Sequence, residues 1–456
     1  MTRVAPLLAL LCTGCFSAHP LEEGESGARL ELIAWAPEDG SGVHVEGLFD
    51  RELAVRCGYR SMADGNLRCL PSPSRRLMFT DDWCARPAAA IAAGCDPTYV
   101  TAGRLTPVDT GCGGTIWRFS GAGYRVRDRV DAERLFELDD TGACVEATSR
   151  PEGELRALER MADEQFVSAE LVVGERSGVE RLGATYLVGD DGSRFWNSFY
   201  DHGREDFCVP FGARSGPIPC LVGRWGIARD PSGDCGGPLV ERVEASCALF
   251  PPTEEFVSAR FDETGCAVEE VTVYGAGEEI PAESLTCSVR EDATFHRPVE
   301  LPEGRVATLS NRPEGTGRLR RIRGRTAWMA SYPPFHLGTF EDASLGGDCA
   351  PRDVNGVMRC VPARAHQVAP VYADAGCSEP ASVESSSECS EYRWWFESEP
   401  GCLGGASQFF RVGPETEAGF ERDEDGACVP VELRMGERVH RLEAVPDETF
   451  AAFRRI

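Results

Sequence analysis

Three stretches of the chain share one order of apolar and polar positions. Each opens with an Arg-Leu pair, at Arg29, Arg181 and Arg318, and continues as an alternating or β-branched-rich run. A turn interrupts each run, for example at Asp191-Gly192, and the run then reaches a Phe followed by an acidic residue. Alternation between turns is typical of half-buried strands. We therefore expect four short strands, forming one antiparallel sheet, in each stretch.

The second half of each stretch ends in a recurring phrase of Phe, acidic residues, Gly and Cys. The copies are residues 136–144, 261–266 and 420–428. Asp followed by Gly is typical of short hairpin loops, whereas a calcium loop needs ligands at fixed spacing and a distal Glu. These phrases therefore predict hairpins rather than calcium sites.

Other local patterns predict the connections. Leu155, Leu158 and Met161 fall at helical spacing, so residues 151–162 are the one stretch in which we expect a helix. Residues 298–317 are rich in Pro and Gly and predict a separator between the second and third stretches. Each stretch closes with an acidic residue three positions before a Phe, at 163–166, 292–295 and 447–450.

Cysteines recur in the same frame in all three stretches. In the first pair of each frame, turn residues such as Asn355-Gly356 lie midway, which predicts a hairpin with the two cysteines on neighbouring strands. These pairs are Cys57 with Cys69, Cys208 with Cys220, and Cys349 with Cys360. The second pairs are Cys84 with Cys95, Cys235 with Cys247, and Cys377 with Cys389. The third pairs are Cys112 with Cys144, Cys266 with Cys287, and Cys402 with Cys428.

We expect disulfides at all of these cysteines, because zinc ligands usually come in short Cys-x-x-Cys knuckles and the chain has none. The third pairs follow least directly from the pattern. Six cysteines allow many connectivities, so repetition indicates only that pairing stays within each repeat.

The frame predicts an all-β protein of three tandem, disulfide-stapled repeats, each with two small antiparallel sheets. The repeats are expected at 28–175, 176–314 and 315–456. Six small sheets in one chain are compatible with a six-bladed β-propeller, which removes exposed edges by closing on itself. Three β-sandwich-like modules in a row fit the periodicity as well.

The amino-terminal residues predict export. Arg3 precedes a short apolar run, which is too short to span a bilayer, and Thr13-Gly14-Cys15 follows. This segment resembles a bacterial lipobox, although Cys12 replaces the usual Leu. The resemblance implies a signal peptide at 1–14, lipidation of Cys15 and a polar tether at 15–27. An ordinary secretory signal cleaved nearby is the alternative.

Cysteine parity agrees with this cleavage, and the following residue bears on the membrane. Of 20 cysteines, removal of Cys12 and use of Cys15 as the anchor leaves 20 − 2 = 18, six per repeat. So many cysteines at regular spacing are typical of an oxidising compartment. Phe16, rather than Asp, follows the anchor, and by resemblance to known sorting signals this implies the outer membrane. No other segment has 18 uninterrupted apolar residues, so we expect no transmembrane helix.

The net charge and the positions of the histidines limit the classes of ligand and cofactor that we expect. The formal net charge is −27, which repels nucleic acid phosphates, so no nucleic acid partner is expected. The 7 His residues are scattered without an i, i+4 pair, so no metal or other cofactor is expected. A run of arginines is a local exception, compatible with an anion patch or with one polar strand: Arg318, Arg320, Arg321, Arg323 and Arg325.

Taken in order, Arg181-Leu182, Asp191-Gly192-Ser193-Arg194, Phe199-Tyr200-Asp201 and Cys69-Leu70-Pro71 resemble the Cys-rich repeats of uncharacterised lipoproteins abundant in myxobacteria. The resemblance covers nearly the whole mature chain. It implies a surface lipoprotein and carries no known activity or site.

One phrase resembles a catalytic segment. Residues 233–239, Gly-Asp-Cys-Gly-Gly-Pro-Leu, are similar to the nucleophile loop of chymotrypsin-like cysteine proteases. Cys235, however, occupies the repeat position of Cys84 and Cys377, which predicts a disulfide rather than a thiolate. The upstream histidines that a base would require lie outside the sequence setting of such proteases: His202, His44 and His19.

The sequence therefore favours a non-enzymatic, lipid-anchored outer-membrane protein, facing the periplasm or the exterior, with a binding or structural role. It does not identify a ligand, for which a protein and a glycan are the candidates. A cysteine protease using Cys235 is the enzymatic alternative. Glycan binding is a third, because Trp196, Trp394 and Trp395 are candidates for stacking on sugars, although packing in a buried core explains them better.

Overall fold

The computed structural model of the protein describes residues 24–38, 42–62, 64–92, 95–109, 115–151, 153–174, 181–211, 217–222, 225–227, 239–243, 255–261, 268–285, 293–302, 304–325, 331–332, 340–363, 365–368, 371–384, 391–396, 407–423 and 426–456. Their elements are strands and three short 3-10 helices, η1 (Asp163–Gln165), η2 (Ala282–Ser284) and η3 (Asp447–Thr449). None of the helices in these ranges is long and apolar enough to cross a membrane.

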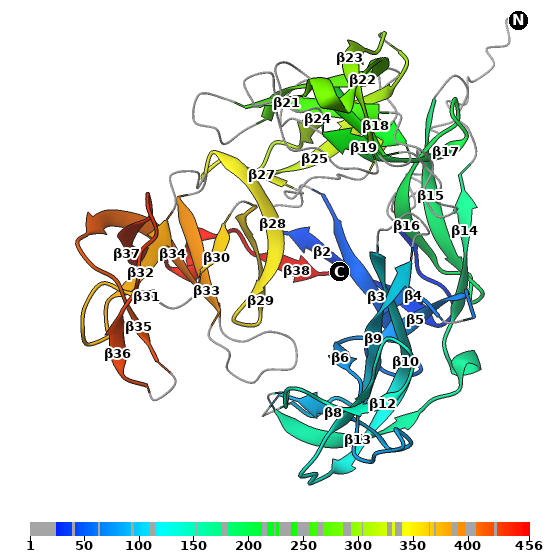
Figure 1. Ribbon diagram of the computed structural model, residues 1–456, viewed down its shortest axis with the longest axis vertical. Coiled ribbons are helices and arrows are strands. Elements are labelled where there is room, and N and C mark those ends of the chain that lie inside the picture. The colour runs from blue at the N-terminus through cyan, green and yellow to red at the C-terminus, as the bar shows by residue number, and fades with distance from the viewer. Residues whose placement is uncertain are drawn as a thin grey trace, which may run out of the picture.

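One 17-stranded sheet at the centre takes strands from all three repeats (Figure 1). Repeat 1 supplies β2 (Leu30–Pro37), β3 (His44–Asp50), β4 (Val55–Ser61), β5 (Leu67–Pro71) and β14 (Ser168–Val173). Repeat 2 supplies β15 (Leu182–Gly189), β16 (Arg194–Asp201), β17 (Asp206–Pro210), β18 (Pro217–Val222) and β24 (Ala307–Glu314). Repeat 3 supplies β25 (Leu319–Arg325), β27 (Phe340–Asp342), β28 (Gly347–Val354), β29 (Val357–Pro362) and β38 (Phe453–Arg455). The short strands β1 (Gly24–Glu25) and β26 (Ser331–Tyr332) pair beside them.

This central sheet closes on itself as a ring. The last strand of each repeat pairs both with the fourth strand of its own repeat and with the first strand of the next, as β14 does with β5 and β15. β38 completes the circuit by pairing with β2, and the bridge from Arg359 to Ala452 ties the start of β38 to β29. Closure gives every main strand of the ring a neighbour on both sides, which avoids long unpaired edges.

A peripheral sheet lies outside the ring in each repeat, and the three form separate lobes in Figure 1. Repeat 1 contributes β6 (Ser74–Arg76), β7 (Met78–Phe79), β8 (Pro87–Ile91), β9 (Tyr99–Asp109), β10 (Thr115–Arg129), β11 (Phe136–Leu138), β12 (Cys144–Glu146) and β13 (Glu154–Arg160). Repeat 2 contributes β19 (Trp225–Ile227), β20 (Val240–Val243), β21 (Glu255–Phe261), β22 (Val268–Ile280) and β23 (Ala293–Glu300). Repeat 3 contributes β30 (His366–Val368), β31 (Val371–Tyr372), β32 (Pro380–Glu384), β33 (Tyr392–Phe396), β34 (Ser407–Thr416), β35 (Phe420–Arg422), β36 (Cys428–Pro430) and β37 (Arg438–Ala444).

Alternation along the fourth ring strand separates the two cores of each repeat. In β5, Cys69 packs with Leu30 and Leu48 on one face. The next residue, Leu70, packs with Val100 and other residues of the peripheral sheet on the opposite face. Leu221 and Val361 occupy the same position in the other repeats and also join peripheral clusters. Each repeat is therefore a two-layer unit with the ring as its inner layer.

The predicted all-β fold of disulfide-stapled repeats is confirmed. The six separate blades of a propeller are not shown, because within the described residues the first-half strands of all repeats merge into one ring. Two-layer, sandwich-like modules joined edge to edge are compatible with the structure. The hairpins expected at 136–144 and 420–428 are present as β11–β12 and β35–β36, and residues 262–267 lie outside the described ranges.

The helix predicted at 151–162 was wrong, since residues 154–160 form β13. Leu155 and Leu158 are both buried, but in different clusters. In a strand, residues three apart point to opposite faces, and here each face packs against a core. The spacing of Leu155 and Leu158 resembled that of a helix because both faces of the strand β13 are buried.

Two other expectations about repeat 2 were also wrong. The predicted separator 298–317 contains a ring strand, β24. Residues 293–295 of the closing phrase placed at 292–295 lie in β23, whereas the hydrogen bond equivalent to those of η1 and η3 joins Arg305 to Pro302. Arg305 N donates to Pro302 O at 3.0 Å, as Gln165 N does to Ala162 O at 3.0 Å.

The described end of the expected tether is ordered against repeat 2. Gly24 and Glu25 pair with Phe195 and Arg194 as β1. The Asp191 carboxylate accepts the N–H groups of Arg29 at 3.0 Å and Leu30 at 2.6 Å. Burial raises the pKa of Asp191, but these bonds and those from Ser193 outweigh it, so the pKa is lowered. The segment that enters β2 is thus bonded to the next repeat.

A buried Arg–Asp pair recurs at the start of every repeat. Its members are Arg29 with Asp50, Arg181 with Asp201, and Arg318 with Asp342. All three Asp side chains have 0% exposure, and each arginine also donates to the backbone of the turn that closes its repeat, as Arg29 does to Gln165 O. The hydrogen bond that Arg29 donates to Asp50 raises the pKa of Arg29.

We predict that Asp342→Ala destabilises the protein by about 2–3 kcal/mol, because it leaves Arg318 without its buried carboxylate. Urea unfolding with disulfides intact measures the shift in midpoint. Glu52→Ala is the matched control: Glu52 pairs with Arg29 but is 70% exposed, so its loss costs at most about 1 kcal/mol. Equal shifts for the two variants would contradict the role of the buried pair.

Candidate functional site

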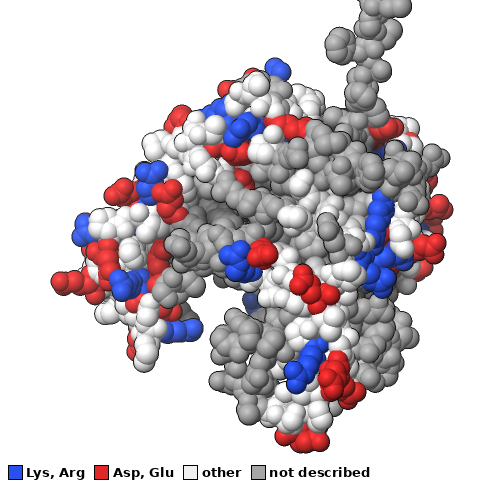
Figure 2. Space-filling model, turned by 90° about the horizontal axis from the view of Figure 1, so that it is seen from above, with Lys and Arg blue, Asp and Glu red and all other residues white. Residues whose placement is uncertain are grey.

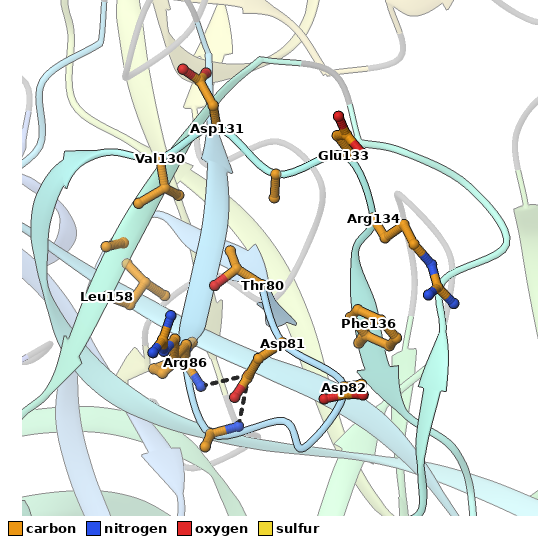
Figure 3. A pocket seen from close by; sticks show the side chains of 14 residues that line it. Thr80, Asp81, Asp82, Arg86, Val130, Asp131, Glu133, Arg134, Phe136 and Leu158 are labelled. Atoms are coloured by element: carbon orange, nitrogen blue, oxygen red, sulfur yellow. Dashed lines mark hydrogen bonds between the residues drawn. The ribbon is translucent and has the colours of Figure 1, made fainter.

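A pocket of about 800 Å³ lies on the peripheral sheet of repeat 1 (Figure 3). The turn at residues 80–87, between β7 and β8, forms one wall, and the loop after β10 forms the other. Its polar lining consists of Thr80, Asp82, Arg86, Asp131, Glu133 and Arg134, with Asp81 at the base of the turn. Phe136 and Leu158 supply part of an apolar floor.

Hydrogen bonds within the turn at residues 80–87 hold this wall of the pocket in place. The Asp81 carboxylate accepts the N–H groups of Ala85 at 3.0 Å and Arg86 at 2.9 Å (Figure 3). Thr80 N donates to Arg86 O at 3.0 Å, and Cys84 has the unusual φ of 51°. Among the described residues, the turn uses the Asp81 carboxylate, and not its other polar side chains, for these bonds.

On the opposite wall of the pocket, the charge of Arg134 is neutralised by an ion pair. Arg134 binds Glu146 through two hydrogen bonds of 2.9 and 2.5 Å, and its guanidinium lies 5.2 Å from the Phe136 ring centre. The bond to Glu146 raises the pKa of Arg134. The Asp131 side chain is 92% exposed, and among the described residues it forms an ion pair with Arg129 at 3.6 Å. Carboxylates facing an open pocket are acceptors for hydroxyl or ammonium groups.

Trp83 projects from the same turn, between two pocket-lining residues, and is 83% exposed. Sequence reasoning missed this residue. Trp196 and Trp394, which it proposed instead, pack against the core clusters of repeats 2 and 3. Trp196 meets Phe199 edge to face, and Arg352 lies over Trp394. The side chain of Trp395 lies outside the described part of the structure.

Repeat 3 contains the same turn with a different set of side chains. The Asp374 carboxylate accepts N–H groups from Ser378 at 2.9 Å and Glu379 at 2.6 Å, and Cys377 also has a φ of 51°. The pocket-lining residues Thr80, Asp82 and Arg86 are there replaced by Ala373, Ala375 and Glu379, and Trp83, which lies outside the lining, is replaced by Gly376. The turn thus forms without them. A comparison of the two turns in the sequence would have been the signal for Trp83.

A second hollow, of about 740 Å³, lies on the same peripheral sheet. Its lining includes Arg75, whose guanidinium forms no ion pair with any residue in the described ranges. Burial lowers the pKa of Arg75. Arg76 beside it is paired with Glu137. The hollow therefore offers a partly buried guanidinium that has no ion-pair partner among the described residues.

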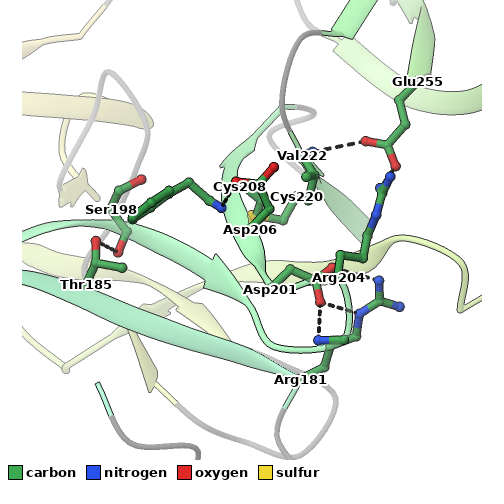
Figure 4. Close-up of a disulfide and its surroundings, with 12 residues drawn as sticks. Arg181, Thr185, Ser198, Asp201, Arg204, Asp206, Cys208, Cys220, Val222 and Glu255 are labelled. Carbon is green, nitrogen blue, oxygen red and sulfur yellow. Dashed lines mark hydrogen bonds and ion pairs between the residues drawn. A yellow bond between two sulfur atoms is a disulfide. The ribbon is translucent and has the colours of Figure 1, made fainter. Parts of the chain in front are cut away.

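The predicted hairpin disulfides are present, with Cα–Cα distances of 5.3, 5.2 and 5.2 Å in repeats 1 to 3. Their cysteines are staggered by two residues rather than directly opposite, so that Cys208 faces Val222 and Cys220 faces Pro210. Figure 4 shows the repeat 2 bridge beside the pair of Arg181 with Asp201. Arg204 and Glu255 form a further ion pair that links the ring to the peripheral sheet.

The predicted second and third pairs were wrong in repeats 1 and 3. Cys84 bonds to Cys144, and Cys377 bonds to Cys428. The reason is tertiary: β11 pairs with β7, which brings the β11–β12 hairpin over the turn that carries Cys84. This bridge fixes the pocket-bearing turn to the hairpin beside it.

Other predicted site residues are only partly visible. Cys95 is disulfide-bonded. The residues that fall outside the described ranges are His19, Cys15, Cys112, Cys235, Cys247, Cys266, Cys287, Cys389 and Cys402. His44 is partly buried, which lowers its pKa, and His202 lies against Tyr200. The cysteine protease alternative therefore stays a prediction from the sequence.

The arginine run of repeat 3 is largely engaged. Arg318 and Arg320 pair with Asp342 and Glu341, and Arg321 is buried beside the Phe340 ring. The side chains of Arg323 and Arg325 lie outside the described part. On the face seen in Figure 2, arginines alternate with Asp and Glu side chains.

Fold and disulfides together define a class: a tandem-repeat, all-β protein whose repeats join in one ring. The chain belongs to the family of unknown function DUF7481, which it matches over residues 7–450. This agrees with the expectation of an uncharacterised family spanning nearly the whole chain. No curated protein and no solved structure matches it.

We predict that non-reducing peptide mapping will recover Cys84 linked to Cys144 and Cys377 linked to Cys428, because both pairs have Cα atoms less than 6 Å apart. The hairpin bridge of Cys349 with Cys360 serves as the internal control. Recovery of Cys84 linked to Cys95 would contradict the placement of the β11–β12 hairpin.

Proposed function

We propose that the protein is a non-enzymatic, lipid-anchored protein of the bacterial outer membrane that binds a ligand in the pocket of repeat 1. The pocket carries the binding part of the proposal. Thr80, Asp82, Trp83 and Arg86 stand on a turn that repeat 3 builds without them. Side chains that the fold does not require, gathered around one pocket, are typical of binding sites.

The disulfides support an oxidising compartment. The observed bridges lie within single repeats and have ordinary Cα spacing, and such frameworks are typical of exported proteins. The lipobox-like segment ending at Cys15, and Phe16 after it, support the anchor and the outer membrane. The likeness to myxobacterial lipoproteins supports the same assignment. The negative net charge argues against nucleic acid as the ligand.

For the anchor, Cys15→Ala is expected to release the protein from the membrane, because the acyl chains can no longer be attached. Incorporation of a fatty-acid analogue, followed by membrane fractionation, measures this, with Cys12→Ala as a matched control that retains labelling. Wild-type protein found unlabelled and free in the periplasm would count against the anchor.

For the absence of catalysis, thiol titration of the unreduced, denatured protein is expected to find no reactive Cys235, since its repeat position predicts a disulfide. Mass spectrometry after alkylation locates any free thiol. A reactive thiol mapped to Cys235, together with peptidase activity abolished by Cys235→Ala, would favour the cysteine protease instead.

A further inference from the structure

The exposure of Trp83 requires an explanation. A tryptophan presents a large apolar surface, and leaving it 83% exposed forgoes the stabilisation that burial brings. The turn does not need it, because Gly376 occupies the same position in repeat 3 with the same Asp and Cys on either side. No ring, hydrogen-bond or ion-pair contact within the described residues engages the indole. The exposed indole of Trp83 is therefore accessible to a ligand.

The neighbours of Trp83 identify the kind of partner. Asp82 and Arg86 present a carboxylate and a guanidinium on the same turn, and Thr80 adds a hydroxyl. Repeat 3 has small apolar residues at the positions of Thr80 and Asp82. A flat aromatic face beside planar, bidentate polar groups suits a ring that has an apolar C–H face and hydroxyls at its rim.

We infer that this pocket and Trp83, which lies on the same turn but outside the pocket lining, together bind an uncharged saccharide: one sugar ring stacks on Trp83 while Asp82 and Arg86 bond the hydroxyls. The inference rests on the proposed binding role and names the ligand class of the same pocket. The charge of the site selects against acidic sugars. Asp82, Asp131 and Glu133 line the pocket, Arg134 is taken up by Glu146, and the whole chain carries −27.

The volume agrees with this ligand class. About 800 Å³ is within the range of small-molecule sites and exceeds what one sugar ring needs. The pocket also has exposed residues on both walls, among them Asp131, so a chain of sugars has room to continue past it. A short oligosaccharide therefore fits better than a single enclosed sugar.

The test is calorimetric titration of the disulfide-intact protein with short neutral oligomers of glucose and of N-acetylglucosamine. Glucosamine oligomers and galacturonic acid oligomers are the cationic and anionic comparisons. We expect a neutral oligomer to bind and to protect Trp83 from oxidation, as mapped by mass spectrometry, and the galacturonic acid oligomers not to bind.

Trp83→Gly reproduces the residue of repeat 3, so the turn is expected to fold, and binding is expected to weaken roughly tenfold or more. Asp82→Ala, which also copies repeat 3, is expected to weaken binding without changing the circular dichroism spectrum. Met435→Ala is the matched control, because it removes a fully exposed apolar side chain from another lobe and should leave binding unchanged.

Two results would overturn the inference. One is binding of the glucosamine oligomers alone, which would make the pocket a cation site. The other is binding of none of these oligomers, or binding that Trp83→Gly leaves intact. Either result would leave the anchored, non-enzymatic role in place, because that role fails only on the acylation of Cys15 or on a reactive Cys235.

Discussion

A buried aspartate held by an arginine at the start of each repeat is the interaction on which the ring depends. Each pair ties together three pieces of chain: the first strand, the end of the second strand and the turn that closes the repeat. Because the closing turn leads directly into the strand that meets the next repeat, the same contact sets both the interior of a repeat and its junction. The hairpin disulfide adds about 3 kcal/mol by closing a short loop.

The sequence contained the local parts of this structure. The first cysteine pair of each frame flanks its own turn, so neighbouring strands and a bridge could be predicted from spacing alone. The partner of Cys84 could not, because Cys144 lies 60 positions away and arrives only when one hairpin packs beside another strand. The ring was equally hidden, because its closing contact joins β2 to β38 across the whole chain. Leu155 and Leu158 misled because burial on both faces of a strand imitates helical spacing.

The candidate site shows the same division. Exposed aromatics cannot be told from buried ones by residue type, so Trp196 and Trp394 were proposed and Trp83 was not. Repetition within one chain removes part of this ambiguity. Where two repeats share backbone bonds and differ in side chains, as at Asp81 and Asp374, the shared residues belong to the fold and the differing ones are not required by it.

The ring is completed by a strand of only three residues, β38. During synthesis from the amino terminus, the backbone N–H and C=O groups at the edges of β2 and of the end of β29 stay unpaired until β38 has been made. Such edges invite a strand from another molecule. Proteolytic cleavage just before Phe453 would therefore expose two strand edges, those of β2 and β29. Both edges could then pair with strands of other molecules.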